Sequence, residues 1–304
     1  MPSILRAGVI GAGVFGGYHA DKYAALQGVT LAAVYDHHPD HARAVAERHG
    51  ARAVSSLAEL LGAVDIVSVA SPAVAHAECA LAALNAGKSA YVEKPIATRL
   101  EDADRIVQAA ARGGLVVACG FLERAAFEAM GLFDISERPL SLEAVRVGPP
   151  SPRNLDVSVV LDLMIHDLDL ALALSPAQPL TVEAEGAAVR NDGFDEVRAL
   201  VDFDDGFSAT FRSSRIGEGR ERTMRLVYPS GEVRVDFLTH AFENTTRFQL
   251  NPNFDDTPAG RDRLGASIGR FLAAVRGEAK PLADAQDGAR ALDLALAVEQ
   301  AVGE

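Results

Sequence analysis

The stretch LRAGVIGAGVFG, residues 5–16, decides the fold of this 304-residue chain. Residues 5–10 are an apolar run typical of a buried strand, and the glycines that follow open a helical pattern. A G-x-G-x-x-G turn in that position presents backbone N–H groups and the positive end of a helix to a pyrophosphate. A bare glycine pattern is often only a tight turn, but the preceding strand favours a dinucleotide site. The residues predicted to form it are Gly11, Gly13, Val14, Phe15 and Gly16.

An acidic residue stands where such a site needs one. Asp36 ends the second apolar run about 20 residues after the glycines, a spacing at which a carboxylate accepts hydrogen bonds from the adenosine ribose. Because a carboxylate there repels a 2′-phosphate, we predict NAD as the cofactor in preference to NADP. His37 and His38 follow Asp36 and weaken that repulsion when protonated. The alternative is that Asp36 is a solvated turn residue. His19 is expected to be a packing or surface residue.

The chain changes character after Gly120. Before it, short apolar runs alternate with helical patterns, which predicts an α/β Rossmann domain with a parallel sheet over residues 1–120. After it, alternating runs separated by turn residues predict an α+β domain with a large open antiparallel sheet over residues 121–304. Asp204-Asp205-Gly206 and Pro229-Ser230-Gly231 lie between such runs as turn signals, so the flanking strands are expected to form hairpins. Two helices, near 262–276 and 284–302, end the chain, and the last of them is expected to pack back on the first domain. The predicted strands are 5–10, 30–35, 66–70, 89–92 and 116–120 in the first domain and 197–203, 207–211, 224–228 and 232–237 in the second.

Composition excludes several classes of protein. The formal net charge of −13 opposes nucleic acid and anionic membranes as partners, since both repel an acidic chain. No apolar run approaches the roughly 20 residues of a membrane span. Cys79 and Cys119 are the only cysteines, too few for a disulfide framework, so we expect a reducing cytoplasm.

Lys94 is the first candidate catalytic residue. It lies in YVEKP, residues 91–95, at the end of a predicted parallel strand, where open α/β sheets bind their ligands. Pro95 disfavours a helical conformation at Lys94, so its ammonium group is expected to extend into the crevice and stabilise charge on a substrate oxygen. The alternative is a surface lysine that follows a strand.

Asp162 and His166 are the second candidate pair. With Asp169 they stand at i, i+4 and i+7 of a helical stretch over 158–173, which puts all three on one stripe. Oxidation of an alcohol needs a base for the hydroxyl proton, and histidine suits that step. Asp162 would orient the substrate, and Asp169 would hold the imidazole or merely solvate the helix. A metal site is the rival reading, but no second histidine at metal spacing supports it, and a structural histidine is another alternative.

Taken together, these motifs resemble the Gfo/Idh/MocA oxidoreductases. The likeness runs through most of the chain and includes SPAVAH at 71–76, EKP at 93–95, Asp162-x-x-x-His166 and the tail at 287–292. The resemblance implies a Rossmann domain followed by an α+β domain whose open sheet mediates homo-oligomerisation, as a dimer or tetramer. It also implies that Lys94, His166 and Asp162 are catalytic. It further implies that five residues line the nicotinamide side of the cofactor site: Ser71, Pro72, His76, Glu93 and Lys94.

The substrate is expected to be a sugar, and a nucleotide sugar is favoured. This compact form is similar to family members that oxidise the 3-hydroxyl of UDP-N-acetylglucosamine. Arginine pairs well with phosphate, so Arg124, Arg153 and Asn154 are the candidate substrate residues, although a loop arginine paired with a surface acid is the simpler reading. The alternatives are a dehydrogenase of a free polyol such as inositol and a non-enzymatic NAD-binding regulator.

Overall fold

The chain forms two compact units. The computed structural model describes residues 4–151, 157–190 and 193–303. The first unit runs to Leu122 and includes Asp262–Ala289, and the second contains Glu123–Arg261 and the residues from Arg290. The division expected from the sequence, 1–120 and 121–304, therefore differs from the observed one, because residues 262–289 pack within the first unit rather than the second.

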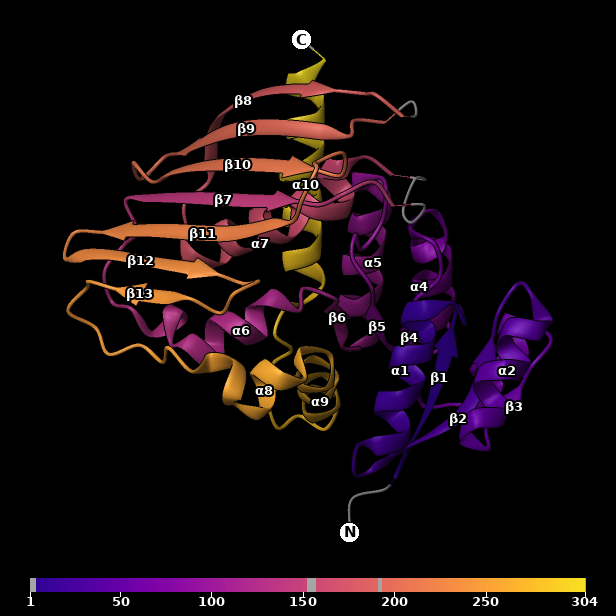
Figure 1. Ribbon diagram of the computed structural model, residues 1–304. Coiled ribbons are helices and arrows are strands. Elements are labelled where there is room, and N and C mark those ends of the chain that lie inside the picture. Colours follow the sequence, from indigo (N-terminus) through magenta and orange to yellow (C-terminus); the bar gives the residue numbers. More distant parts are fainter. Residues whose placement is uncertain (1–3, 152–156, 191–192, 304) are drawn as a thin grey trace. The chain divides into compact units, whose positions relative to one another are not determined.

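The first unit is a Rossmann fold built on a six-stranded parallel sheet of order β3-β2-β1-β4-β5-β6 (Figure 1). This strand order reverses beside β1, and ligands of such sheets bind at that reversal, beyond the carboxyl ends of the strands. The elements are β1 (Leu5–Ile10), α1 (Val14–Ala25), β2 (Val29–Tyr35), α2 (Pro39–His49), β3 (Arg52–Ala53), α3 (Leu57–Ala63), β4 (Ile66–Val69), the 3₁₀ turn η1 (Ala73–Ala75), α4 (His76–Asn85), β5 (Ser89–Val92), α5 (Leu100–Gly113), β6 (Val117–Cys119), α9 (Arg263–Val275) and the first residues of α10 (Ala285–Val302).

Helix α9 joins the first unit through its apolar face. Ile268 and Phe271 are fully buried in the same core as Tyr91 of β5, and the rings of Phe271 and Tyr91 meet edge to face at 5.9 Å. Tyr91 Oη and Ser267 Oγ also share a hydrogen bond of 2.9 Å. The burial of these large side chains explains why α9 belongs to the Rossmann core, although Ser267 lies 176 residues beyond Tyr91 in the sequence.

The second unit contains a seven-stranded sheet of order β13-β12-β11-β7-β10-β9-β8. The hairpins expected at Asp204-Asp205-Gly206 and Pro229-Ser230-Gly231 are confirmed, because β9–β10 and β11–β12 pair antiparallel. One pair, β7–β10, is parallel, so the sheet is mixed. The elements are α6 (Glu123–Met130), the 3₁₀ turn η2 (Leu132–Asp134), β7 (Ser141–Val147), the π-helical turn η3 (Val160–Met164), α7 (Ile165–Leu174), β8 (Pro179–Ala187), β9 (Glu196–Phe203), β10 (Ser208–Ser214), β11 (Glu221–Tyr228), β12 (Gly231–Asp236), β13 (Phe242–Asn244), the 3₁₀ turn η4 (Phe254–Asp256), α8 (Pro258–Arg261) and the rest of α10.

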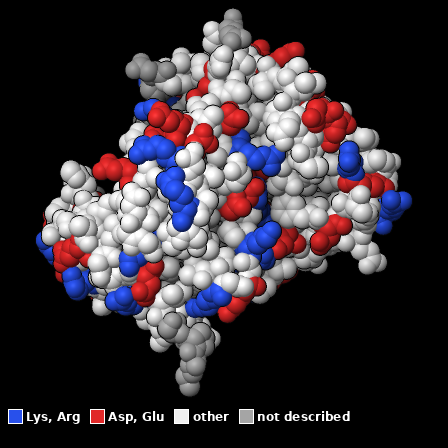
Figure 2. Space-filling model, turned by 180° about the vertical axis from the view of Figure 1, so that it is seen from behind, with Lys and Arg blue, Asp and Glu red and all other residues white. Residues whose placement is uncertain are grey.

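Within this unit the sheet has a covered face and an open face. Helices α7 and α10 lie along one face (Figure 1), and the inward residues of β9, such as Val197 and Val201, are fully buried beneath them. The alternate residues of β9 are exposed, as is Arg198, or half-buried, as are Leu200 and Asp202. In the view of Figure 2, acidic and basic side chains are interspersed over the surface of the described residues. A search of the described helices finds none with the length and apolar character needed to cross a bilayer.

Candidate active site

The glycine turn between β1 and α1 has the geometry that a dinucleotide requires. Gly11 adopts a positive φ of 90°, and a Cβ there would lie 2.5 Å from the backbone nitrogen of Ser71. A Cβ on Gly16 would lie 1.8 Å from the carbonyl oxygen of Gly11, so this glycine lets α1 pack against the turn. Gly13 caps α1 and has open space where a Cβ would be. The turn therefore leaves room for a pyrophosphate at the N-terminus of α1.

Asp36 holds the adenosine side of this turn in place. Its Oδ2 accepts a hydrogen bond of 2.6 Å from the backbone N–H of Ala12, and its Oδ1 accepts one of 2.8 Å from that of His38. A carboxylate oxygen accepts more than one hydrogen bond, so Asp36 retains capacity for ribose hydroxyls. The cradle at Gly13 and this fixed carboxylate fit NAD. The solvated-turn alternative for Asp36 is weakened, since the side chain is only 12% exposed.

His76 connects the two loops that are expected to flank the nicotinamide. Its Nδ1 lies 2.7 Å from the carbonyl oxygen of Pro95, and its Nε2 lies 2.8 Å from that of Ser71. Burial lowers the pKa of His76, although these two carbonyls act in the opposite direction. The ring thereby ties the loop after β4, which begins at Ser71-Pro72, to the loop after β5. The Lys94–Pro95 peptide bond is cis.

Lys94 is the one partly exposed residue in the segment 91–97, whose other members are buried. Glu93, just before it, is 7% exposed, and its carboxylate lies 2.8 Å from Nε2 of His19. His19 is fully buried on α1 rather than at the surface, and its Nδ1 lies 2.9 Å from Ser68 Oγ. Sequence reasoning assigned His19 no functional role. The one sequence feature that pointed to a role for His19 is its position on the helix that follows the glycine turn.

The second group of candidates lies at the start of α7. Asp162 falls within the π-helical turn and is buried, whereas His166 lies in the first turn of α7 and is partly exposed. Single π-helical turns occur often at functional sites, because the extra residue redirects side chains. The hydroxyl of Ser158 accepts hydrogen bonds from the backbone N–H groups of Val160 and Leu161, at 3.1 and 3.3 Å, and so anchors the beginning of this segment.

Two buried ion pairs hold α7. Asp169 is 1% exposed and receives both Nε and Nη2 of Arg124, at 2.9 and 2.7 Å. Asp169 is therefore buried and paired, and it does not merely solvate the helix. Arg124, which was expected to contact the substrate, places its guanidinium in this buried pair, and its substrate role stays a prediction. Arg146 of β7 contacts Asp167 in the same bidentate way, at 3.0 and 2.7 Å. The expected substrate residues Arg153 and Asn154 lie outside the described residues.

No group of three or more histidine, cysteine or acidic side chains among the described residues is arranged to hold a metal ion. The candidate groups are Lys94 and Glu93 in the first unit and Asp162 and His166 in the second. This combination of a Rossmann sheet, a glycine turn and an acid at the end of β2 defines an NAD-binding protein.

Comparison with known proteins identifies its family. Residues 5–121 match the family model described as "Oxidoreductase family, NAD-binding Rossmann fold", and residues 148–234 match the model "GFO/IDH/MocA C-terminal domain". The chain is 36% identical to the UDP-N-acetylglucosamine 3-dehydrogenase of Acidithiobacillus ferrooxidans over 98% of this chain and 97% of that protein. The chain belongs to the Gfo/Idh/MocA oxidoreductases, and its cofactor is NAD.

Solved structures agree with this assignment. The structure of the Acidithiobacillus ferrooxidans enzyme matches with a TM-score of 0.90 over 98% of this chain and 97% of that chain. The WlbA dehydrogenase from Bordetella pertussis, in complex with NADH and UDP-GlcNAcA, has the same fold at 20% identity, with a TM-score of 0.85 over 98% of this chain and 96% of that chain. Inositol 2-dehydrogenase 3 of Saccharopolyspora erythraea is 37% identical over 54% of this chain and 52% of that protein.

Proposed function

We propose that this protein oxidises the 3-hydroxyl of a UDP-linked N-acetylglucosamine and passes the hydride to NAD. The observation that carries this proposal is the extent of the likeness. The UDP-N-acetylglucosamine 3-dehydrogenase matches 98% of the chain, through both units, whereas the inositol dehydrogenase at similar identity matches 54%. Because substrate specificity in a two-domain dehydrogenase depends on the domain that binds the substrate, a match through that domain is the more informative one.

The proposed roles follow from the chemistry of each side chain. Bound NAD supplies the hydride acceptor. His166 takes the hydroxyl proton as the hydride leaves, which is the role of a general base. The Lys94 ammonium group donates a hydrogen bond to the same oxygen and stabilises its developing negative charge. Asp162 accepts a hydrogen bond from a neighbouring hydroxyl of the sugar and so orients the ring.

The remaining substrate contacts are also proposals. Arg153 and Asn154 are proposed to bind the diphosphate of the nucleotide sugar, because a guanidinium pairs well with phosphate oxygens. The two arginines that flank α7 are engaged by Asp167 and Asp169, which leaves the 152–156 segment as the favoured source of that contact. We further propose a cytoplasmic protein without nucleic-acid or membrane partners, consistent with the net charge of −13 and the burial of both cysteines, Cys79 and Cys119.

The test is a substrate screen that follows NADH at 340 nm. UDP-N-acetylglucosamine, free N-acetylglucosamine and myo-inositol are supplied with NAD, and the oxidised carbon is located by NMR of the product. We expect activity with the nucleotide sugar alone. His166→Ala and Lys94→Met should each lower kcat by about 10²-fold or more, with little change in the dissociation constant of NADH.

Lys280→Met is the matched control, because Lys280 is an exposed lysine that the proposed mechanism does not use. Activity with myo-inositol and none with the nucleotide sugar would overturn the proposed substrate in favour of a free polyol. An inactive protein that still binds NADH would favour a regulator. Full activity of His166→Ala would remove His166 from the role of base.

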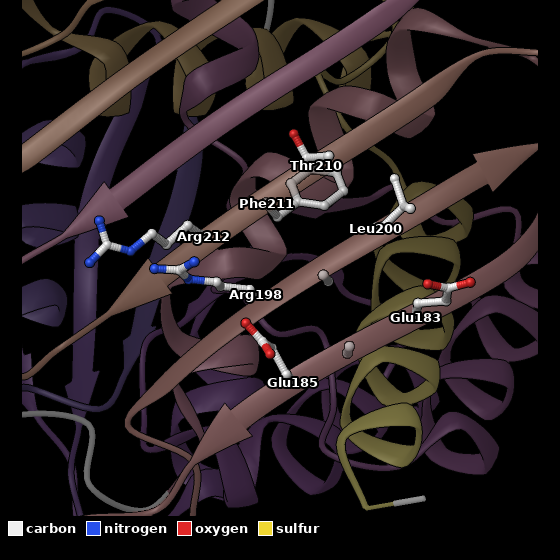
Figure 3. A pocket seen from close by; sticks show the side chains of 9 residues that line it. Glu183, Glu185, Arg198, Leu200, Thr210, Phe211 and Arg212 are labelled. Carbon is white, nitrogen blue, oxygen red and sulfur yellow. The ribbon is translucent and has the colours of Figure 1, made fainter.

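We also propose a homo-oligomer, a dimer or tetramer, formed through the open face of the seven-stranded sheet. A shallow hollow on this face is lined by residues of β8, β9 and β10, among them Glu185, Arg198 and Arg212 (Figure 3). About a two-fold axis, Glu185 of one copy would face an arginine of the other, so ion pairs between the two copies would stabilise such an interface.

A further inference from the structure

A chain of hydrogen bonds runs through the Rossmann core to the residue that precedes Lys94. Tyr23 Oη lies 2.7 Å from Ser68 Oγ, and the same Ser68 oxygen lies 2.9 Å from Nδ1 of His19. Nε2 of His19 then lies 2.8 Å from Oε1 of Glu93. The first three residues are completely buried, at 0% exposure, and Glu93 is 7% exposed. The network therefore holds a carboxylate out of water at the end of β5.

The donors and acceptors of this network fit one arrangement of protons. An ionised carboxylate only accepts hydrogen bonds, so Nε2 of His19 carries a proton and donates a hydrogen bond to Glu93. In a neutral ring Nδ1 is then the acceptor, so the Ser68 hydroxyl donates to His19 and the Tyr23 hydroxyl donates to Ser68. A protonated His19 would leave one of the two hydroxyl hydrogens without an acceptor in this network. With a neutral His19 ring, every donor in the network has an acceptor, and the only charge is the negative charge of Glu93.

Gly120 confines the same carboxylate from the other side. A Cβ at Gly120 would lie 2.7 Å from Oε2 of Glu93 and 2.9 Å from its Cδ. The carboxylate therefore lies directly against the backbone that follows β6, in a space that only a glycine leaves open. Gly120 has no positive φ, so the constraint is the close approach of Glu93 and not the backbone conformation.

We propose that His19 is a positioning residue: with Gly120 it fixes the Glu93 carboxylate, and thereby the backbone that presents Lys94. The position of Glu93 supports this reading. A buried carboxylate destabilises the fold unless it is paired, and this one lies at the carboxyl end of a parallel strand, where α/β sheets bind ligands, next to the partly exposed lysine. The inference rests on the proposed catalytic role of Lys94.

One part of the test needs no substrate. In protein loaded with NAD and labelled with ¹⁵N-histidine, NMR should show His19 as the neutral tautomer with its proton on Nε2. The Glu93→Gln variant should shift that proton strongly, because the charged acceptor is gone. A His19 ring with its single proton on Nδ1 would overturn the proposal, whatever the substrate of the enzyme. The proposed function of the protein and the proposed positioning role of His19 can therefore be disproved independently of each other.

The other part compares variants with whichever alcohol the wild type oxidises. His19→Leu should lower kcat by about 10-fold or more while the dissociation constant of NADH changes by less than about threefold, because misplacement of a catalytic group affects turnover before cofactor binding. His19→Gln, whose amide still donates to Glu93, should recover most of that loss. Gly120→Ala should reproduce the kcat loss, because its methyl group displaces the same carboxylate.

A third variant, Ser68→Ala, removes the hydroxyl that bonds His19 on its other side, and Ser267→Ala is its matched control. Each substitution removes a buried serine hydroxyl bonded to a buried tyrosine in the same unit, but Ser267 pairs with Tyr91 and has no bond to His19. Only Ser68→Ala should lower kcat. Equal losses in the two serine variants, or unchanged kcat in both folded His19→Leu and Gly120→Ala, would reduce the network to core packing. If His19→Leu does not fold, Gly120→Ala and His19→Gln carry the same comparison.

Discussion

Glu299 is a single residue that links the C-terminal helix to the segment carrying Asp162 and His166. Its carboxylate accepts a hydrogen bond from the Ser158 hydroxyl, the same hydroxyl that caps the start of this segment. Burial raises the pKa of Glu299 above its ordinary value, and the bond from Ser158 only partly offsets that effect. The charged form of Glu299 is therefore less favourable in the folded protein than in the unfolded chain.

The sign of the pH dependence follows from this raised pKa. Folded protein binds the proton of Glu299 more tightly than unfolded protein, so this group favours folding below the unfolded pKa of about 4.3, and its contribution is lost as pH rises through the folded pKa. Glu299→Gln keeps an acceptor for Ser158 and removes the charge. We expect the variant to exceed the wild-type melting temperature by about 1–2 °C at pH 8 and to match it near pH 4.

Thermal unfolding of both proteins between pH 4 and 8 checks this prediction. Glu278→Gln, which changes an exposed glutamate, is the control and should follow the wild type across the whole range. A Glu299→Gln variant that melts below the wild type at pH 8 would contradict it and would mean that the carboxylate stabilises the folded protein in its charged form.

At the scale of elements, α7 is held by charge as well as by apolar packing. Asp167 pairs with Arg146 of β7, and Asp169 pairs with Arg124 of α6, so the two acids that follow His166 fix the helix from two directions. Burial lowers the pKa of Arg146, but the carboxylates of Asp167 and Glu123 raise it by more, so the guanidinium stays charged. These pairs set the orientation in which α7 presents His166.

The prediction is that breaking one pair destabilises the fold far more than losing a surface pair. Arg146→Met leaves the Asp167 carboxylate buried without its partner and should lower the free energy of unfolding by about 3–5 kcal/mol. The double variant Arg146→Met/Asp167→Leu should regain most of that loss, because the Asp167 carboxylate is no longer buried without a partner. Glu123, the second acid beside Arg146, keeps its ion pair with Arg222 in this variant. Arg234→Met, which breaks a pair whose arginine is 53% exposed, should change stability by less than about 1 kcal/mol.

Urea unfolding of the four proteins gives these free energies. If the double variant is as unstable as Arg146→Met, the arginine stabilises α7 through its packing and not through its charge. Turnover provides a second readout, since a double variant that regains stability but not kcat would indicate that the pair also orients His166.

The same elements show what the sequence could predict. The β1–α1 turn and the two hairpins depend on neighbours in sequence, and the pattern of glycines and turn residues predicts them. Asp36 is predicted by its spacing from the glycines, which the β-α-β unit keeps constant. The partners of Asp167 and Asp169 lie 21 and 45 residues away, and no local pattern indicates them. Strand β7 was not predicted either, because it pairs in parallel with β10, far along the chain. The π-helical turn at 160–164 was also missed, since periodicity does not distinguish it within an apolar helix.

At the scale of the whole molecule, the open sheet face has an unbalanced arrangement of charges. Arg212 and Arg198 lie directly opposite each other on paired strands, and Glu185 lies opposite Arg198 on the next strand. Figure 3 shows the two arginine side chains extending the same way along their strands. Like charges directly opposite each other destabilise a sheet. In this register Glu185 lies opposite Arg198 and not opposite Arg212, so a carboxylate of a second copy against Arg212 would reduce the repulsion between the two arginines.

We therefore predict that the wild type is a dimer or tetramer at micromolar concentration and that charge reversal on this face dissociates it. Arg198→Glu/Arg212→Glu places acids against the Glu185 of a second copy, and the repulsion should shift the protein to monomers in sedimentation velocity. Arg43→Glu changes an exposed arginine on α2 and should leave the assembly intact. A monomeric wild type would remove the open face as an interface. An oligomer that survives the double reversal would place the contact elsewhere, and in that case the facing arginines would be balanced by solvent and ions rather than by a second chain.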